Sequence, residues 1–368
     1  MTLQGKSMMI WKVSRCEGGN PQAIASAAQA AGLSCVLLKI ADGPKPYNIE
    51  GTPARDQLPA VVEALRAKGL QVWGWHYVYG YNPQGEAQAA IQRMRELELD
   101  GYVINAEAEY KQTGKKQAAK TFMDLVRPAL ANTPIALTSY RWPSYHPQLP
   151  WREFLEKCDL NMPQVYWQSA HNPDSQLRRT LREFQALVPY RPIIPIGPMY
   201  KYGSWEPTPA DVSEFMETAE SLNLSGVCFF EWYYARTILS PLWNTLAAYT
   251  WSPSLQPIDF PAQLIQAYNQ QDYTRLYHLY HPDAVHISPD QTVQGHEGIL
   301  RWYHSFFVDQ FPSGRFTLTG ASGNNTNRTF TWSAQGANGT IMDGNDTLGI
   351  LQNRISYHYS YYSIRKPK

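Results

Sequence analysis

Short apolar runs alternate with amphipathic segments over the first 250 residues, and this alternation limits the fold more than any other feature of the sequence. Eight runs have the length and apolarity of buried strands, at residues 9–13, 35–40, 72–78, 102–105, 135–138, 160–166, 193–196 and 226–230. Helical patterns lie between most of them, at 21–31, 57–68, 85–98, 116–130, 174–187 and 210–222. Eight strands with helical crossovers predict an α/β fold, the (β/α)8 TIM barrel. A doubly wound sheet is less favoured, because no Gly-rich phosphate loop follows the first strand.

The character of the sequence changes at residues 251–258, where two prolines interrupt the pattern and predict a linker. Beyond it, a helical segment at 261–280 precedes a Thr-, Tyr- and Gly-rich stretch at 316–364 that is typical of antiparallel strands. We therefore expect a barrel at residues 1–250, a linker at 251–258 and a small α+β domain at 259–368.

Composition excludes several classes of function. The 32 Lys and Arg residues nearly balance the 31 Asp and Glu residues, so the net charge of +1 gives no electrostatic reason to expect nucleic acid or a membrane as partner. No apolar run approaches the roughly 18 residues of a spanning helix, and the N-terminus lacks the apolar stretch of a secretory signal. We expect a soluble chain made without such a signal, which could still be released by another route to act on a cell wall. The 4 cysteines form no CxxC pair, and neither a metal nor a cofactor is expected.

Carboxylates near the end of the fourth predicted strand are the strongest chemical signal. Asn105, Glu107 and Glu109 alternate with small or apolar residues, and a period of two places all three on one face of a strand. Active sites of TIM barrels lie at the C-terminal ends of the strands. A catalytic role for Glu107 is therefore favoured over the alternative, a structural ion pair with Lys39.

The barrel resembles the family-25 glycoside hydrolases, which are lysozymes that cut peptidoglycan. Five segments carry the resemblance in order: IWKVS at 10–14, CVLLKIADG at 35–43, WHY at 75–77, NAE at 105–107 and QVY at 164–166. The resemblance implies a glycosidase acting on an amino-sugar polymer such as peptidoglycan. Lys12 and Asn105 stand where the family has Asp, so a non-catalytic glycan-binding or assembly protein is the alternative.

The resemblance also implies roles for individual residues. Glu107 corresponds to the family's general acid; Glu231, at the end of the eighth strand, is the expected second carboxylate, and Glu109 is held in reserve. The residues expected to contact the sugar are Lys39, His76, Asn105, Gln164, Tyr166, Trp167, Tyr200 and Trp232.

The second domain resembles the SnoaL-like, nuclear-transport-factor-like family. Four segments carry this resemblance, at residues 267–287, 293–299, 344–347 and 354–359. It implies a curved sheet wrapped around helices as a cone with a pocket, and a homodimer formed through this domain. A third functional hypothesis places the activity in this cone, on a small hydrophobic ligand. Asp283 and His286 are candidates to face such a pocket, although a turn and a packed edge are favoured for them.

Overall fold

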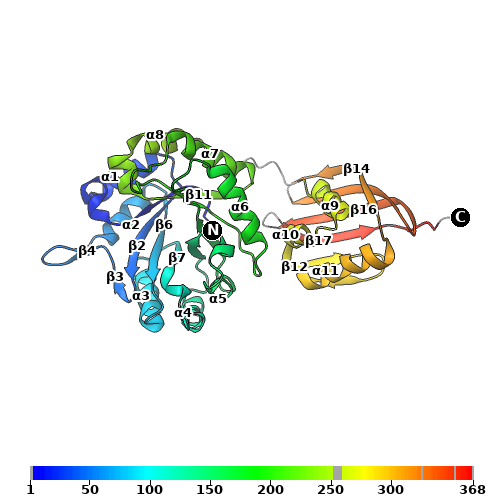
Figure 1. Ribbon diagram of the computed structural model, residues 1–368, viewed down its shortest axis with the longest axis horizontal. Coiled ribbons are helices and arrows are strands. Elements are labelled where there is room, and N and C mark those ends of the chain that lie inside the picture. Colours follow the sequence, from blue (N-terminus) through cyan, green and yellow to red (C-terminus); the bar gives the residue numbers. More distant parts are fainter. Residues whose placement is uncertain (1–2, 252–258, 325, 352–353, 367–368) are drawn as a thin grey trace. The chain divides into compact units, whose positions relative to one another are not determined.

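The computed structural model describes residues 3–251, 259–324, 326–351 and 354–366. The chain divides into two compact units, Met1–Ser254 and Leu255–Lys368, drawn in blue to green and in yellow to red in Figure 1. Apart from Trp251, the predicted linker at 251–258 lies outside the described residues.

The first unit is a closed barrel of parallel strands, which confirms the predicted fold. Its strands are β1 (Gly5–Ile10), β2 (Cys35–Asp42), β6 (Gln71–Val78), β7 (Gly101–Ala106), β8 (Ile135–Tyr140), β9 (Leu160–Gln164), β10 (Ile196–Pro198) and β11 (Gly226–Phe230). Each pairs in parallel with the next, and β1 closes the ring by pairing with both β2 and β11. The short β3 (Lys45–Pro46) adds antiparallel to β2, and β4 (Ile49–Glu50) pairs with β5 (Arg55–Asp56) in a separate hairpin.

Helices surround the barrel strands, as Figure 1 shows. They are α1 (Pro21–Ala30), α2 (Leu58–Ala67), α3 (Pro83–Glu96), α4 (Lys115–Ala129), α5 (Trp151–Leu155), α6 (Pro173–Gln185), α7 (Pro209–Ser221) and α8 (Ser240–Ala248). Most begin with proline at the first or second helical position, where its missing N–H costs nothing. Side chains of Asn20, Asn82 and Thr208 cap three of them by accepting backbone N–H groups.

The barrel core has an inner and an outer layer, because successive side chains of a strand point to opposite faces. The inner layer fills the barrel with residues such as Met9, Leu37, Trp75, Val103 and Met162. The outer layer packs the other strand face against the helices. Inward positions nearest the C-terminal ends of the strands are therefore the ones that can line a site.

The first strand begins and ends earlier than the predicted run at 9–13. It starts at Gly5 and ends at Ile10, and Val13 begins a short helical turn. The polar residues Lys6 and Ser7 obscured its start in the sequence. Both are buried with partners: Lys6 Nζ donates to the carbonyls of Leu246 (2.7 Å) and Tyr249 (2.6 Å), and Ser7 Oγ donates to the Val227 carbonyl (2.9 Å).

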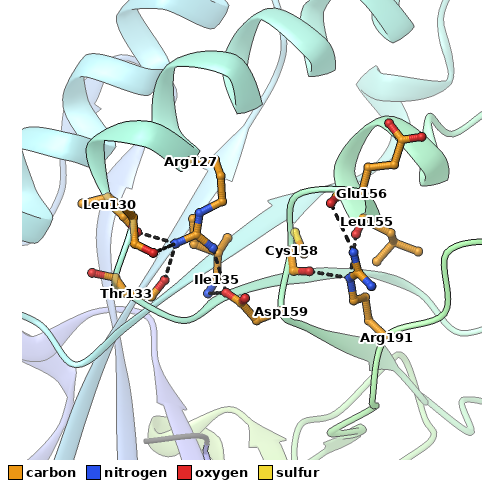
Figure 2. A network of polar contacts seen from close by, with 10 residues as sticks. Arg127, Leu130, Thr133, Ile135, Leu155, Glu156, Cys158, Asp159 and Arg191 are labelled. Atoms are coloured by element: carbon orange, nitrogen blue, oxygen red, sulfur yellow. Dashed lines mark hydrogen bonds and ion pairs between the residues drawn. The ribbon is translucent and has the colours of Figure 1, made fainter. Parts of the chain in front are cut away.

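Arg127 and Arg191 hold the loops that lead into β8 and β9 by hydrogen bonds, as Figure 2 shows. Arg127 pairs with Asp159 at 2.8 Å and donates to the Thr133 carbonyl at 2.8 Å, near the end of α4. Asp159 also accepts the backbone N–H of Ile135, the first residue of β8, at 2.8 Å. Arg191 donates to the Leu155 carbonyl at 2.8 Å and the Glu156 carbonyl at 3.2 Å, at the end of α5. The N-terminal face of the barrel is thus held by polar side chains that bind backbone groups.

The second unit is an α+β domain with a six-stranded sheet in the order β13-β12-β17-β16-β15-β14. Its elements are α9 (Phe260–Gln270), α10 (Tyr273–Leu279), β12 (Tyr280–Ile287), β13 (Thr292–Gln294), α11 (Gly295–Ser305), β14 (Arg315–Gly323), β15 (Asn327–Gly336), β16 (Gly339–Leu351) and β17 (Arg354–Tyr361). The helix predicted at 261–280 is two helices, because Gln271 adopts a left-handed conformation (φ 48°) that ends α9. Aromatic side chains from the helices and from one sheet face form a core separate from that of the barrel.

Within the residues described, no helix is both long enough and apolar enough to cross a membrane.

Candidate active site

A cavity of about 610 Å³ lies at the C-terminal ends of the barrel strands. This volume is in the usual range for a small-molecule or oligosaccharide site. Polar side chains such as Lys39, Asn105, Glu107 and Gln164 line it together with many aromatic rings. The aromatic lining comprises Trp11, Trp75, Tyr77, Tyr140, Trp142, Tyr145, Tyr166, Tyr200 and Phe230. Aromatic faces beside a few polar groups are suited to a pyranose ring, which presents both C–H and hydroxyl groups.

Glu107 lines this cavity directly after β7 and is half-buried. Its Oε1 accepts a hydrogen bond from Gln164 Nε2 at 2.9 Å, and the same amide nitrogen lies 3.3 Å from Asn105 Oδ1. Gln164, at the end of β9, therefore links Asn105 and Glu107. These two polar residues follow Val103 on the inward side of β7. The carboxylate does not pair with Lys39, whose Nζ lies 2.6 Å from Asp42 Oδ2.

Four tyrosine hydroxyls lie within the electrostatic reach of Glu107. Burial raises the pKa of Tyr77, Tyr140, Tyr166 and Tyr200, and the negative charge of Glu107 raises each pKa further. These hydroxyls therefore stay protonated at neutral pH and can donate hydrogen bonds to a ligand or to the carboxylate.

Glu109 leaves the face that it was predicted to share with Asn105 and Glu107. The strand ends at Ala106, and Ala108 begins a helical turn that extends to Lys111, so the period of two stops before Glu109. Glu109 still contacts the cavity lining, because its Oε2 accepts a hydrogen bond from the Tyr77 hydroxyl at 2.8 Å. The carboxylate of Glu109 is thus connected to the cavity through the Tyr77 hydroxyl.

Lys39 lies in the cavity wall with only 5% of its side chain exposed. Its ammonium group lies 4.2 Å from the ring centre of Tyr47, 5.1 Å from Trp75 and 5.6 Å from Trp11. Burial lowers the pKa of Lys39, and the hydrogen bond to Asp42 opposes that shift. Asp42 therefore neutralises the charge of Lys39, and the ammonium group packs against aromatic rings of the cavity wall.

Glu231 does not line the cavity, contrary to the expectation that it would be the second carboxylate. Phe230 takes the inward position at the end of β11, and Glu231 follows after the strand has ended. Glu231 is buried, and it accepts the backbone N–H groups of Tyr233 (3.3 Å) and Tyr234 (3.2 Å). Burial raises its pKa, and those two N–H groups oppose the shift. Glu231 therefore caps the helical turn that follows β11.

Three residues expected to contact sugar also lie outside the cavity, on the outward face. His76 is buried between the Tyr102 hydroxyl (2.9 Å) and the Gly43 carbonyl (2.7 Å). Trp167 packs against Phe215, with ring centres 5.1 Å apart, in the layer between strands and helices. Trp232 packs in the same layer against Trp243 at 4.8 Å. For His76 and Trp167 the reason is the alternation of side chains, because their neighbours Trp75, Tyr77 and Tyr166 are the inward residues.

The structure brings five of the expected sugar-binding residues together at the cavity: Lys39, Asn105, Gln164, Tyr166 and Tyr200. Sequence reasoning missed Arg141, Tyr145 and His146, which follow β8 directly and line the cavity together with Trp142. The dense cation-aromatic run RWPSYH at 141–146 could have identified this loop, because it stands where a barrel strand ends.

The second unit holds a buried polar network. The Tyr280 hydroxyl hydrogen-bonds to His358 Nδ1, and His358 Nε2 lies 2.8 Å from Asp346 Oδ2. Asp346 also accepts from Trp332 Nε1 at 2.9 Å and from Ser360 Oγ at 2.7 Å, and all of these residues are buried. The network continues from the Tyr280 hydroxyl to that of Tyr303 at 2.6 Å, and it explains residues of two resemblance segments, 344–347 and 354–359, as interior supports.

The two residues considered for a pocket of the cone lie apart. Asp283 has 85% of its side chain exposed, whereas His286 is buried and stacks on His358 with ring centres 4.5 Å apart. Among the described residues, no group of three or more His, Cys, Asp or Glu side chains could hold a metal ion.

The SnoaL-like domain family matches residues 262–358. A search of curated proteins finds no match. Similar solved structures include an NTF2-like protein of unknown function from Cytophaga hutchinsonii, with 11% identity and a TM-score of 0.25, covering 28% of this chain and 88% of that one. An NTF-2 like protein of unknown function from Burkholderia xenovorans has 12% identity and a TM-score of 0.26, covering 30% of this chain and 84% of that one.

A third similar structure is a protein with a ketosteroid isomerase-like fold from Catenulispora acidiphila, in complex with trimethylamine. It has 16% identity and a TM-score of 0.26, and the match covers 29% of this chain and 88% of that one. Likenesses of this size say nothing about activity. The resemblance of the barrel to family-25 glycoside hydrolases rests on its sequence motifs alone. The family match assigns one part of the chain: residues 262–358 form a SnoaL-like domain.

Proposed function

We propose that the barrel is a glycosidase that cleaves an amino-sugar polymer such as peptidoglycan, with Glu107 as its general acid. One observation carries the proposal: a half-buried carboxylate, which has no ion-pair partner among the described residues, lines an aromatic cavity at the C-terminal ends of the strands and is hydrogen-bonded to the amide of Gln164. This is where TIM barrels carry out their chemistry. Glycoside hydrolysis needs an acid at this kind of place to protonate the leaving oxygen.

The second catalytic group is Glu109, acting through Tyr77. Glu107 donates its proton to the glycosidic oxygen as the bond to the anomeric carbon breaks. Water attacks that carbon and passes a proton to the Tyr77 oxygen, while Tyr77 passes its own proton to Glu109 along the 2.8 Å hydrogen bond. Glu231 has no part in this scheme because its carboxylate caps backbone N–H groups away from the cavity.

The remaining cavity residues bind and orient the sugar in this proposal. Asn105 and Gln164 offer amide groups beside Glu107, and the hydroxyls of Tyr166 and Tyr200 offer donors. Lys39 keeps its charge paired with Asp42 and holds the rings of Trp11 and Trp75 in the wall, where they can stack on the sugar.

The test is the Glu107→Gln variant assayed on purified cell walls by turbidity loss and release of reducing ends. The substitution keeps the size and the hydrogen-bond capacity of the side chain but removes the proton donor. We expect a rate loss of about 10²–10⁴. Glu63→Gln on α2, an exposed position, is the matched control and should keep full activity. Full activity in a folded Glu107→Gln variant rejects this assignment.

A specific observation supports a second candidate function, glycan binding without cleavage. Among the described residues that line the cavity, Glu107 is the single carboxylate, and Asn105 stands where the hydrolases that the barrel resembles have Asp. Wild-type protein that binds wall glycan in a calorimeter but releases no reducing ends over prolonged incubation supports this candidate over the first.

A further inference from the structure

Three tyrosines at the end of β6 form a row that begins in the cavity and ends at the surface. Buried Val78 and Gly80 separate Tyr77, Tyr79 and Tyr81, so the alternation of the strand continues past its last residue. The ring centres of Tyr77 and Tyr79 lie 4.8 Å apart, and those of Tyr79 and Tyr81 lie 6.4 Å apart, with planes 18° from parallel. Tyr77 lines the cavity, whereas Tyr81 is 65% exposed. These three residues are called the tyrosine row below.

The backbone that carries the tyrosine row is held by two buried side chains. Glu86, on α3, accepts the N–H groups of Tyr79 at 3.2 Å and of Gly80 at 3.0 Å, and Lys115 Nζ donates to the Tyr79 carbonyl at 2.9 Å. Gly80 has a φ of 66°, which favours glycine, and a Cβ there would lie 2.8 Å from the ring of Tyr110. The loop after β6 is therefore fixed by hydrogen bonds and by packing.

The outer rings of the row are oriented as well as exposed. The ammonium group of Lys115 lies 3.5 Å from the ring centre of Tyr81, and this cation–π contact holds the ring. The Tyr79 ring is oriented by its hydroxyl, which donates to Asp42 Oδ1 at 2.7 Å. The exposed part of Tyr81 is therefore a contact surface with a defined orientation.

Another exposed tyrosine at the same end of the barrel lacks such support. Tyr202, in the loop after β10, is 59% exposed, and within the described chain no aromatic ring or cation packs on it. A ring that is already oriented loses less conformational freedom when a ligand stacks on it. The tyrosine row is therefore better suited than Tyr202 to bind a ligand that extends out of the cavity.

We propose that the tyrosine row binds the part of a saccharide chain that extends beyond the cavity. This inference rests on the proposed glycosidase function and adds a binding surface outside the cavity, which makes affinity depend on chain length. Aromatic rings offer large, flat contact areas, and the faces of a saccharide ring present C–H groups to them. The Tyr81 hydroxyl also lies 3.4 Å from Gln112 Oε1, so the chain would leave between the loops that follow β6 and β7.

Two ligands of different length test this inference: the peptide-free disaccharide and the peptide-free hexasaccharide of alternating N-acetylglucosamine and N-acetylmuramic acid. Binding is measured by calorimetry on the full chain carrying Glu107→Gln, which prevents cleavage. The disaccharide is short enough to stay in the cavity, whereas the hexasaccharide extends over its rim. We expect this parent protein to bind the hexasaccharide about tenfold more tightly or better.

Variants of the outermost ring in the same background identify the surface responsible. Tyr81→Ala should lower the affinity for the hexasaccharide about tenfold. It should leave the affinity for the disaccharide unchanged, which also shows that the variant is folded. Tyr81→Phe keeps the ring and should bind both ligands as the parent does. The matched control is Tyr202→Ala, which removes another exposed tyrosine and should change neither affinity.

The outcomes separate this inference from the proposed function. Equal binding of both lengths to the parent, or an unchanged hexasaccharide affinity in Tyr81→Ala, overturns the role of the tyrosine row and leaves the glycosidase proposal in place. A loss in Tyr202→Ala instead, or an equal loss for both lengths in Tyr81→Ala, overturns it in the same way. Failure of the parent to bind either ligand counts against the proposed function, and this inference is then rejected with it.

Discussion

The hydroxyl of Tyr77 connects the cavity with the carboxylate of Glu109, which lies outside it. Its hydroxyl donates to Glu109 at 2.8 Å, and its ring lines the cavity that also contains Glu107. In Tyr77→Phe the proposed path for the water proton is lost, whereas the stacking surface stays. We expect kcat to fall by about 10²–10⁴ with little change in KM, measured by reducing-end release. Tyr81→Phe, at an exposed tyrosine, is the control, and a Tyr77→Phe enzyme with normal kcat contradicts the relay.

His76 makes the stability of the barrel depend on pH. Nε2 lies 2.7 Å from the Gly43 carbonyl, which can only accept, so Nε2 carries the proton and Nδ1 accepts from the Tyr102 hydroxyl. Burial lowers the pKa of His76 from 6.5 to about 4. The unfolded chain therefore binds more protons between these values, and stability falls as the pH drops from 6.5 to 4.

The loss attributable to His76 should reach about 3 kcal/mol at pH 4 and should disappear as the pH rises above 6.5, where the residue becomes neutral in both states. Urea unfolding of wild type and of His76→Gln across this range measures it as the difference between the two slopes. Parallel pH dependence in the two proteins would show that this histidine does not contribute.

Single residues show where sequence reasoning works and where it stops. Asn105, Glu107 and Gln164 were found from the sequence because they continue the inward register of two strands. Glu231 was not placed correctly, because its direction depends on how the chain turns after Phe230, and that turn leaves no periodic signal. Arg141 was missed because an arginine in a loop looks like an exposed residue until its burial is seen.

At the scale of elements, arginine side chains hold the loops that lead into β8 and β9 by hydrogen bonds to backbone carbonyls. Arg191 binds carbonyls at the end of α5 and before β9, and Figure 2 shows it beside the Arg127–Asp159 pair. Arg191→Ala should cost about 1–3 kcal/mol of unfolding free energy, because it leaves these carbonyls without their charged donor. Catalytic rate should not change, since these contacts lie at the N-terminal ends of the strands.

Chemical denaturation of the whole chain measures that cost. The control is Arg152→Ala, which breaks an exposed ion pair with Glu156 and should cost much less stability than Arg191→Ala. Equal losses in the two variants would mean that the carbonyl contacts of Arg191 add nothing beyond a surface charge.

Elements with a regular pattern were predicted well, and the exceptions have physical causes. The number and order of the barrel strands follow from apolar runs that are buried on both faces. The start of β1 was missed because Lys6 is a buried cation whose partners, the carbonyls of Leu246 and Tyr249, are some 240 residues away. Contacts of that sequence separation cannot be read from a local pattern.

At the scale of the whole molecule, each unit has its own core. The barrel core lies below a cavity, and the core of the second unit contains a buried polar network. The barrel leaves a lined cavity above its inner layer. In the SnoaL-like domain, Tyr280, His358 and Asp346 are buried and bind one another, which indicates a structural role for these three residues.

The outer face of the second sheet carries a row of exposed tyrosines. Tyr357, Tyr359 and Tyr361 on β17 are 39%, 42% and 49% exposed, and they alternate with buried His358 and Ser360. Tyr359 and Tyr361 lie opposite Thr347 and Asn345 on β16, so the middle of this face has no charge. Tyrosine is enriched in the cores of protein interfaces, where it gives a large contact area at low entropic cost. We propose that two copies of the chain pair through this face.

Tyr359→Glu should disrupt such a pair, because it places two carboxylates in the middle of an uncharged contact, where neither has a partner. Light scattering during size-exclusion chromatography should give a dimer for wild type and a monomer for this variant, and Tyr359→Phe should remain dimeric. Tyr81→Glu in the barrel, which adds the same charge at another exposed tyrosine, should leave the dimer intact. A wild-type chain that stays monomeric at every concentration contradicts the pairing, and a dimer that survives Tyr359→Glu moves it to a different surface.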